Sequence, residues 1–219
     1  MSMSEKILVS TQVTFFYKNS VDEFDKFSSK IKEKFGSGQA QILPLPSSAP
    51  SELPRLHLVI DPLVVRGYPN RTDFIFKDGL PEERAVTKLI EIVSESSLTV
   101  NKLGFVNTYF ADEPISNFVS LLNRELLSGH QVTEVGIMIN EPHEIQGVQC
   151  NDIEKIDGGT ITDNQTGEKK EGSIILRDIN TVKGEDISAR FSTASLETLI
   201  SALEERASEL LIAHGQEGE

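Results

Sequence analysis

The chain is poor in cysteine and has no tryptophan and no long apolar run. Cys150 is the only cysteine among 219 residues, which excludes an internal disulfide and a multi-cysteine zinc site. No apolar stretch approaches the roughly 20 residues that span a bilayer. The opening residues, MSMSEKILVSTQ, lack the basic and apolar regions of a signal peptide. These absences predict a cytoplasmic protein that makes no membrane contact.

Positive charge is also scarce. The chain has 21 Lys and Arg against 34 Asp and Glu, a net charge of −13. Residues 98–219 hold 9 of the basic and 21 of the acidic residues, and so account for −12 of that total. Such a surface repels nucleic-acid phosphates and anionic membranes, and it favours a basic protein partner. Solubility is the alternative explanation for the same charge.

Signatures of catalysis and of cofactor binding are missing from the sequence. It has no nucleophile elbow, no phosphate-binding loop and no dinucleotide fingerprint. The segment EPHEIQGVQCNDIE, residues 141–154, gathers acidic residues with His143 and Cys150, but no spacing in it matches a zinc or calcium motif. We interpret it as a charged hairpin, with Gly147 as a bulge, and expect neither a metal nor a cofactor.

The first half of the chain alternates between strand and helix patterns. Residues 7–17 predict a strand with Ile7, Val9, Val13 and Phe15 on one face. Ser20 and Glu23 fit a capping box, so we expect a helix to begin at Ser20. Short strands at 56–60, 63–68 and 72–76 follow, and Leu80-Pro81 should open a second helix. The expected core stripes of the two helices are Phe24, Phe27, Ile31 and Phe35, then Val86, Leu89, Ile90 and Val93.

The same order of patterns then recurs. The expected elements are a strand at 98–110, a helix at 113–128, strands at 131–139, 145–156, 159–163, 172–180 and 185–191, and a helix at about 193–213. The two earlier stripes match Ile115, Phe118, Leu122 and Leu126 at an offset of 91, and Leu196, Leu199, Ile200 and Leu203 at an offset of 110. We therefore predict an α+β fold of duplicated β-α-β4-α units, over residues 1–97 and 98–214, with 215–219 as a tail.

This element order resembles one repeat of the TATA-box-binding-protein fold, in which two such units form one curved sheet with helices on its outer side. The resemblance covers nearly the whole chain and involves no sequence motif. It implies antiparallel sheets with helices on one face, and it implies nothing about function, because one fold serves many functions.

Our first functional candidate is a non-enzymatic protein-interaction module, such as an adaptor, an inhibitor or a regulatory subunit. Its partner would be another protein or a second copy of the chain, held by a sheet face or by the acidic second half. Apolar side chains expected to point away from the helices are Leu8, Phe16, Leu103, Phe105 and Tyr109. Such residues mark either a recognition surface or burial between halves or subunits. The acidic candidates, expected at the surface, are Glu141, Glu144, Asp152 and Glu154.

The alternative candidate is an enzyme that acts on a small anionic substrate. His57 is the only histidine inside a well-formed strand pattern, and Arg55, Arg66 and Tyr68 lie near it in the segment RLHLVIDPLVVRGY. These four residues are candidates for an anion-binding or ligand-binding site. A salt-linked strand surface explains the same residues. An enclosed pocket lined by all four side chains would distinguish the two explanations.

Overall fold

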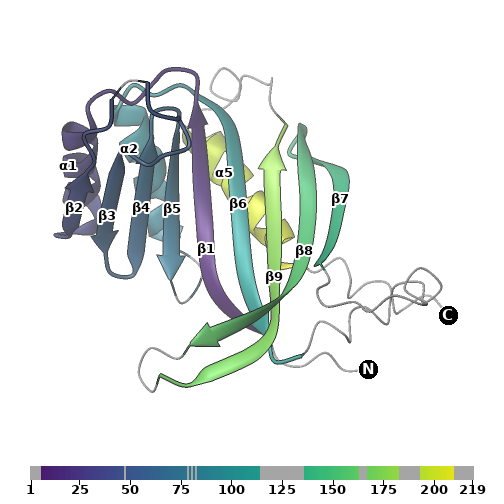
Figure 1. Cartoon of the computed structure of the whole chain (residues 1–219). Coiled ribbons are helices and arrows are strands. Elements are labelled where there is room, and N and C mark those ends of the chain that lie inside the picture. Colours follow the sequence, from purple (N-terminus) through teal and green to yellow (C-terminus); the bar gives the residue numbers. More distant parts are fainter. Residues whose placement is uncertain are drawn as a thin grey trace.

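A computed structural model describes residues 6–46, 48–77, 79, 81, 83–113, 136–162, 167–182 and 193–209. In these ranges the chain is α+β: one large antiparallel sheet carries three helices on one side (Figure 1). The helices are α1 (Phe24–Phe35), α2 (Glu83–Glu95) and α5 (Thr193–Ser208). No helix in the described ranges combines the length and the apolar character needed to cross a bilayer.

Both halves of the chain contribute to the same sheet, whose described strands run in the order β2-β3-β4-β5-β1-β6-β9-β8-β7. The first strands of the two halves, β1 and β6, pair in the middle. The first-half strands are β1 (Lys6–Tyr17), β2 (Gln39–Ile42), β3 (Leu56–Ile60), β4 (Leu63–Tyr68) and β5 (Arg71–Lys77). The second-half strands are β6 (Val100–Ala111), β7 (Gly136–Ile145), β8 (Val148–Thr162) and β9 (Lys169–Thr181).

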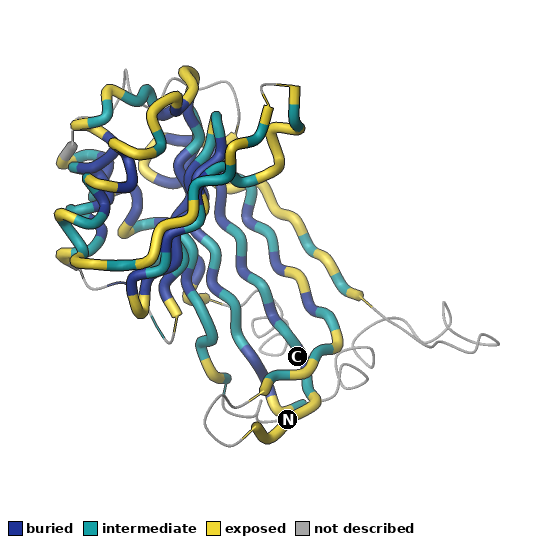
Figure 2. The backbone as a smooth tube through the Cα atoms, turned by 60° about the vertical axis from the view of Figure 1, so that its left-hand side comes forward, coloured by how far each residue is buried: buried dark blue, intermediate teal, exposed yellow. Residues whose placement is uncertain are grey.

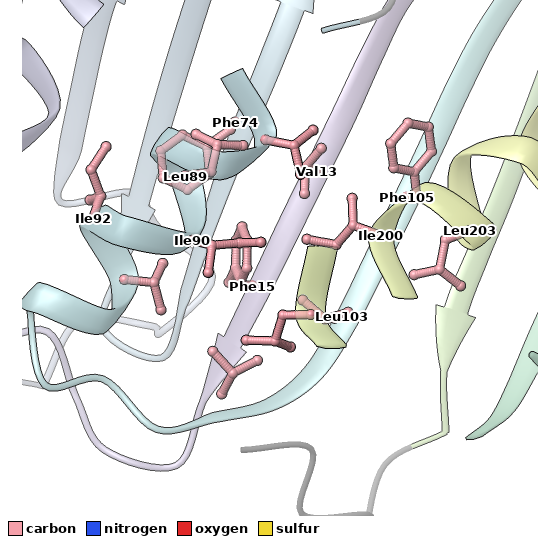
Figure 3. Close-up of a cluster of buried hydrophobic side chains, with 14 of the residues drawn as sticks. Val13, Phe15, Phe74, Leu89, Ile90, Ile92, Leu103, Phe105, Ile200 and Leu203 are labelled. Atoms are coloured by element: carbon pink, nitrogen blue, oxygen red, sulfur yellow. The ribbon is translucent and has the colours of Figure 1, made fainter. Parts of the chain in front are cut away.

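The core lies between the sheet and the helices. The expected stripes of α2 and α5 are confirmed, since all eight residues are buried: Val86, Leu89, Ile90, Val93, Leu196, Leu199, Ile200 and Leu203. Figure 3 shows side chains of α2 and α5 gathered with those of β1, β5 and β6. Phe15 and Phe74 meet edge to face, with ring centroids 6.0 Å apart. Each buried side chain of this size contributes about 1.5–3 kcal/mol of transfer free energy.

Several expected boundaries are wrong. Helix α1 begins at Phe24 rather than Ser20, and its N-cap, Glu23, makes no side-chain capping bond, so the capping box does not form. Helix α2 is described from Glu83, and the positions 80 and 82 on either side of Pro81 lie outside the described residues. The strands expected at 145–156 and 159–163 are one strand, β8.

The turn between β7 and β8 also differs from the expected bulge. Gln146 and Gly147 have φ angles of 52° and 73° and form a two-residue hairpin turn. Two successive positive φ angles match the twist of the flanking strands, and glycine adopts the second one without strain. Strand β7 therefore continues to Ile145, beyond the expected end at residue 139.

A β-bulge overturns the expected face of the residues at the start of the first strand. The pairing of β1 with β6 shifts register between Leu8 and Ser10, so residues before the bulge change face. Ile7 is 53% exposed, whereas Val13 and Phe15 are buried in the core.

The expected helix at 113–128, the expected strand at 185–191 and the tail at 215–219 lie wholly or largely outside the described residues. The duplicated order therefore stays a prediction.

Candidate binding site on the open face of the sheet

The two faces of the sheet differ in what covers them. In the central pair, Val13 lies opposite Phe105 and Phe15 lies opposite Leu103, and all four side chains are buried on the helix side. Successive side chains point to opposite faces, so Gln12, Thr14 and Phe16 point to the other face. No described helix covers this second face, which we call the open face (Figure 1). Figure 2 shows buried residues alternating with less buried ones along the strands.

One row of the open face alternates aromatic rings with cations. Strand pairing places Tyr68, Arg71, Phe16 and Lys102 side by side across β4, β5, β1 and β6. The Arg71 guanidinium carbon lies 4.1 Å from the Tyr68 ring centroid and 5.9 Å from that of Phe16. The Lys102 ammonium lies 5.1 Å from the Phe16 centroid. Such contacts contribute about 0.5–1 kcal/mol each at exposed sites, so they hold the row in order.

The next row is polar and unusually well buried for a face without a helix. It places Asp73, Thr14, Gly104 and Asn180 side by side across β5, β1, β6 and β9. The three side chains are only 5%, 4% and 7% exposed. The Thr14 hydroxyl donates to Asp73 Oδ1 at 3.1 Å, and Arg71 Nε lies 3.3 Å from the same oxygen. Since no described helix covers this face, neighbouring side chains of the face itself shield these three polar side chains from solvent.

A third row completes a depression that we call the central hollow. Gln12 Nε2 donates to the Thr14 hydroxyl at 2.9 Å, and Asn180 Nδ2 donates to Asp178 Oδ1 at 3.0 Å. The hollow has a volume of about 190 Å³. Its lining comes from the three rows: Phe16, Arg71 and Lys102; Thr14, Asp73, Gly104 and Asn180; Gln12, Val106 and Asp178.

Both carboxyl groups of the hollow are perturbed. Burial raises the pKa of Asp73 above its ordinary range, against the opposing effects of the Arg71 charge and the Thr14 hydrogen bond. Burial likewise raises the pKa of Asp178, against the Asn180 hydrogen bond and the Lys102 charge. Desolvation is the largest influence on the pKa at both positions, so a further hydrogen-bond donor or cation would stabilise the charged form of each carboxylate.

Two larger cavities lie elsewhere. One, of about 610 Å³, lies between the start of α1 and the end of α2 and is lined mostly by polar residues such as Asn19, Lys26 and Glu95. The other, of about 470 Å³, lies between the end of α1, the start of α2 and the β3–β4 turn. The lining of the second includes Lys77, Gly79 and Pro81, and the intervening positions of the sequence are outside the described residues. The central hollow is smaller, but described residues from four adjacent strands build it.

The four residues of the enzyme candidate lie on the open face but share no described cavity. His57 pairs with Arg66, and Tyr68 pairs with Arg71. Arg55 Nη1 donates to the carbonyls of Leu45 and Pro46, at 2.6 and 3.2 Å, and so holds the preceding loop. Tyr68 is 6% exposed, with Arg71 over its ring. None of the three cavities above is lined by Arg55, His57, Arg66 or Tyr68.

Of the apolar partner-binding candidates, Phe16 lies on the open face, as expected, and three others, Leu103, Phe105 and Tyr109, do not. Phe105 is 0% exposed and belongs to the helix-side core (Figure 3). The Tyr109 hydroxyl donates to the carbonyl of Ala207 in α5 at 3.4 Å, so it also faces the helices. The error comes from the offset of 91, which is odd. Between Ser10 and Phe16 the register pairs odd residues of β1 with odd residues of β6, so in this stretch only an even offset preserves the face.

The acidic candidates divide into an exposed pair and a buried pair. Glu141 and Glu144 are exposed. Asp152 and Glu154 are 0% and 1% exposed, so the expectation that they lie at the surface is wrong. Asp152 Oδ1 lies 2.6 Å from Arg177 Nη1, Asp152 Oδ2 accepts from Arg206 Nε at 2.6 Å, and Glu154 Oε2 lies 3.8 Å from Arg177 Nε. Two arginines distant in sequence neutralise them.

This buried network has a structural role that the sequence pattern did not indicate. Arg177 is 0% exposed, and it donates from Nε to the carbonyl of Glu209 at 2.7 Å and from Nη2 to that of Arg206 at 3.3 Å. The last carbonyls of a helix have no partner within the helix, and a cation there also offsets the helix dipole. Arg177 therefore caps the end of α5 from inside the sheet.

The described ranges contain no group of three or more His, Cys, Asp or Glu side chains arranged to hold a metal ion. No protein-family model matches the chain, and no curated protein matches it by sequence. Most residues of the candidate site were missed at the level of sequence, including Arg71, Asp73, Lys102, Asp178 and Asn180. The polar alternation of Gln12 and Thr14 was visible, but the strand pairing that gathers the others was not.

Proposed function

We propose that the protein is a non-enzymatic interaction module that binds a partner protein through the open face, centred on Phe16 and the central hollow. One observation carries the proposal. The middle of a face without a described helix holds polar side chains no more than 7% exposed, beside a row of aromatic rings and cations. Tyr and Arg are enriched among the residues that dominate binding energy at interfaces, and aromatic residues in general are enriched there.

The enzyme alternative has less support. Arg55 is engaged with loop carbonyls and Tyr68 is covered by Arg71, which leaves His57 and Arg66 of the four candidates to meet an anionic substrate. The hollow itself is poorly suited to acid–base work. Asp73 and Asp178 lie on β5 and β9, three strand spacings apart, or about 14 Å at the usual spacing. The paired catalytic carboxyl groups of glycosidases, for comparison, are about 5–10 Å apart.

Charge bears on the choice of partner. The net charge of −13 favours a partner with positive charge, and Glu141 and Glu144 remain available at the surface. Asp152 and Glu154 do not contribute to such an attraction, because their charges are neutralised in the core. A cytoplasmic setting, expected from the single cysteine, is part of the proposal.

The duplicated, TATA-box-binding-protein-like order is also part of the proposal. Outward from the β1–β6 pair, β5, β4 and β3 of the first half correspond to β9, β8 and β7 of the second, and α2 corresponds to α5. An experimental structure that resolves residues 113–128 tests the duplication. A helix there, packed on the same side of the sheet as α1, supports it, and any other structure contradicts it.

The binding proposal is tested by truncating one ring. A partner captured with the wild-type chain should bind the Phe16→Ala variant at least tenfold more weakly by isothermal titration calorimetry. The matched control is Met138→Ala, because Met138 is 69% exposed on the edge strand β7, four strands from β1. Equal losses for both variants, or a loss for the control alone, would contradict docking at Phe16. If the captured partner is a second copy, sedimentation will show a dimer that Phe16→Ala dissociates.

A further inference from the structure

We propose that the central hollow binds a small dipolar ligand that carries one ammonium group and one carboxylate. The inference rests on the proposed function in one respect: the hollow lies within the face assigned to partner docking. Ligand binding and docking are nevertheless separate events that different measurements report.

The charges of the hollow are separated along the strands. Arg71 and Lys102 flank Phe16 in one row, Asp73 lies in the next row, and Asp178 lies in the row after that. Successive rows are two residues, or about 7 Å, apart. The hollow is therefore positive at one end and negative at the other. Arg71 and Asp73 already pair with each other, so the charges left to a ligand are those of Lys102 and Asp178. A ligand with both charges satisfies both of these groups, whereas a singly charged ligand leaves one of them without a close counter-charge in a partly desolvated site.

Unused hydrogen-bonding capacity remains at both ends. Within the described residues, the side-chain hydrogen bonds that Asp73 and Asp178 accept, from Thr14 and from Asn180, both go to Oδ1. A carboxylate has room for further donors on its second oxygen. At the other end, the Lys102 ammonium rests on the Phe16 ring and makes no hydrogen bond within the described residues. Its three donors are available to a ligand carboxylate.

Gly104 keeps the floor of the hollow open. A Cβ built on Gly104 would meet the Cβ atoms of Thr14 and Asn180 at 3.7 Å, an ordinary contact distance, and its φ angle is not in the left-handed region. Neither the backbone nor the neighbours require glycine here. The missing side chain instead leaves space between the two charged ends. At about 190 Å³, the hollow is smaller than the roughly 300–1,000 Å³ of drug-sized sites and suits a molecule the size of an amino acid.

The test is an NMR titration of the full chain with zwitterions in which the two charges are progressively farther apart: glycine, β-alanine and γ-aminobutyrate. Butyrate and butylamine serve as singly charged probes. At least one zwitterion should shift the amide signals of Thr14, Gly104 and Asn180, with a dissociation constant on the order of 1 mM. Both singly charged probes should bind at least tenfold more weakly. Equal binding by butyrate or butylamine, or no shift with any zwitterion at about 20 mM, would overturn the proposal.

Matched substitutions locate the ligand. Lys102→Met and Asp178→Asn should each weaken zwitterion binding at least tenfold. Lys155→Met and Asp157→Asn are the same changes in an exposed ion pair on β8, outside the hollow. They should leave the affinity for the zwitterion unchanged. Gly104→Val should abolish the shifts in a chain that still folds, as checked by circular dichroism. Unchanged binding in Lys102→Met and Asp178→Asn would place the ligand elsewhere and refute the inference. Partner affinity, measured with Phe16→Ala, reports separately on the proposed function.

Discussion

Asp152→Asn should be among the most damaging conservative changes in this chain. The substitution keeps the shape of the side chain and removes its charge. Asp152 is 0% exposed, and its two oxygens each lie 2.6 Å from a guanidinium nitrogen, one of Arg177 and one of Arg206. The change therefore leaves the cations of Arg177 and Arg206, at the end of α5, with one fewer counter-charge.

The size of the effect follows from burial. Removal of one partner from a buried ion pair costs about 3–5 kcal/mol, because the other charge stays desolvated. Glu154, at 3.8 Å from Arg177, retains part of the compensation, and Arg206 is 21% exposed, so we expect a loss near the lower limit, about 3 kcal/mol. Domains of this kind have about 5–15 kcal/mol of stability in total, so the loss is large.

Urea unfolding followed by circular dichroism measures it. Glu141→Gln and Glu144→Gln are the matched controls, since both side chains are exposed, and each should change the free energy of unfolding by less than about 0.5 kcal/mol. Raising the salt concentration should not remove the effect of Asp152→Asn, because buried pairs are weakly screened. A loss below about 1 kcal/mol would refute the reasoning and mean that water reaches the network.

Three further outcomes are expected. Phe27→Ala should lower the free energy of unfolding by about 3–5 kcal/mol, because Phe27 is 3% exposed in the core; a loss below about 1 kcal/mol in urea would contradict its burial. Gly38→Ala should lower the free energy of unfolding by about 1–3 kcal/mol, because its Cβ would overlap the Val59 carbonyl oxygen. Gly104→Ala, whose Cβ would have contacts at 3.7 Å, should leave the stability in thermal unfolding unchanged. The native state holds the Asp178 proton more tightly than the unfolded chain does, so wild-type stability should fall as pH rises from 3.8 through the raised pKa of Asp178. That part of the slope should be missing from Asp178→Asn in unfolding titrations across pH, and an identical slope would contradict the raised pKa.

Periodicity predicted the elements whose burial depends on local pattern alone. The stripes of α2 and α5 are buried as expected, because an amphipathic helix has one way to bury its apolar face. The strands β4 and β5 were also located, on either side of Pro69-Asn70. The edges of elements were less predictable. Ser20 and Glu23 have the spacing of a capping box, but the helix begins only at Phe24, and its N-cap Glu23 makes no side-chain capping hydrogen bond.

The site depends on strand pairing, which the sequence does not encode locally. Phe16 was recognised because an apolar residue breaks the alternation of β1. Lys102, Asp73 and Asn180 become its neighbours only through pairings of β1 with β5 and β6, and of β6 with β9. The burial of Asp152 has the same origin, since its partners Arg177 and Arg206 come from β9 and α5. A shift of one residue in register moves a whole strand to the opposite face, which is why Phe105 was assigned to the wrong side.

Photo-crosslinking from the two sides of the sheet tests the central claim most directly. A benzophenone amino acid would replace Gln12 on the open face in one variant and exposed Glu33 of α1, on the helix side, in the other. If the partner docks on the open face, it should crosslink to position 12 at least tenfold more than to position 33, and Phe16→Ala should remove the crosslink at position 12. Stronger crosslinking at position 33, or crosslinking at position 12 that survives Phe16→Ala, would contradict docking on that face.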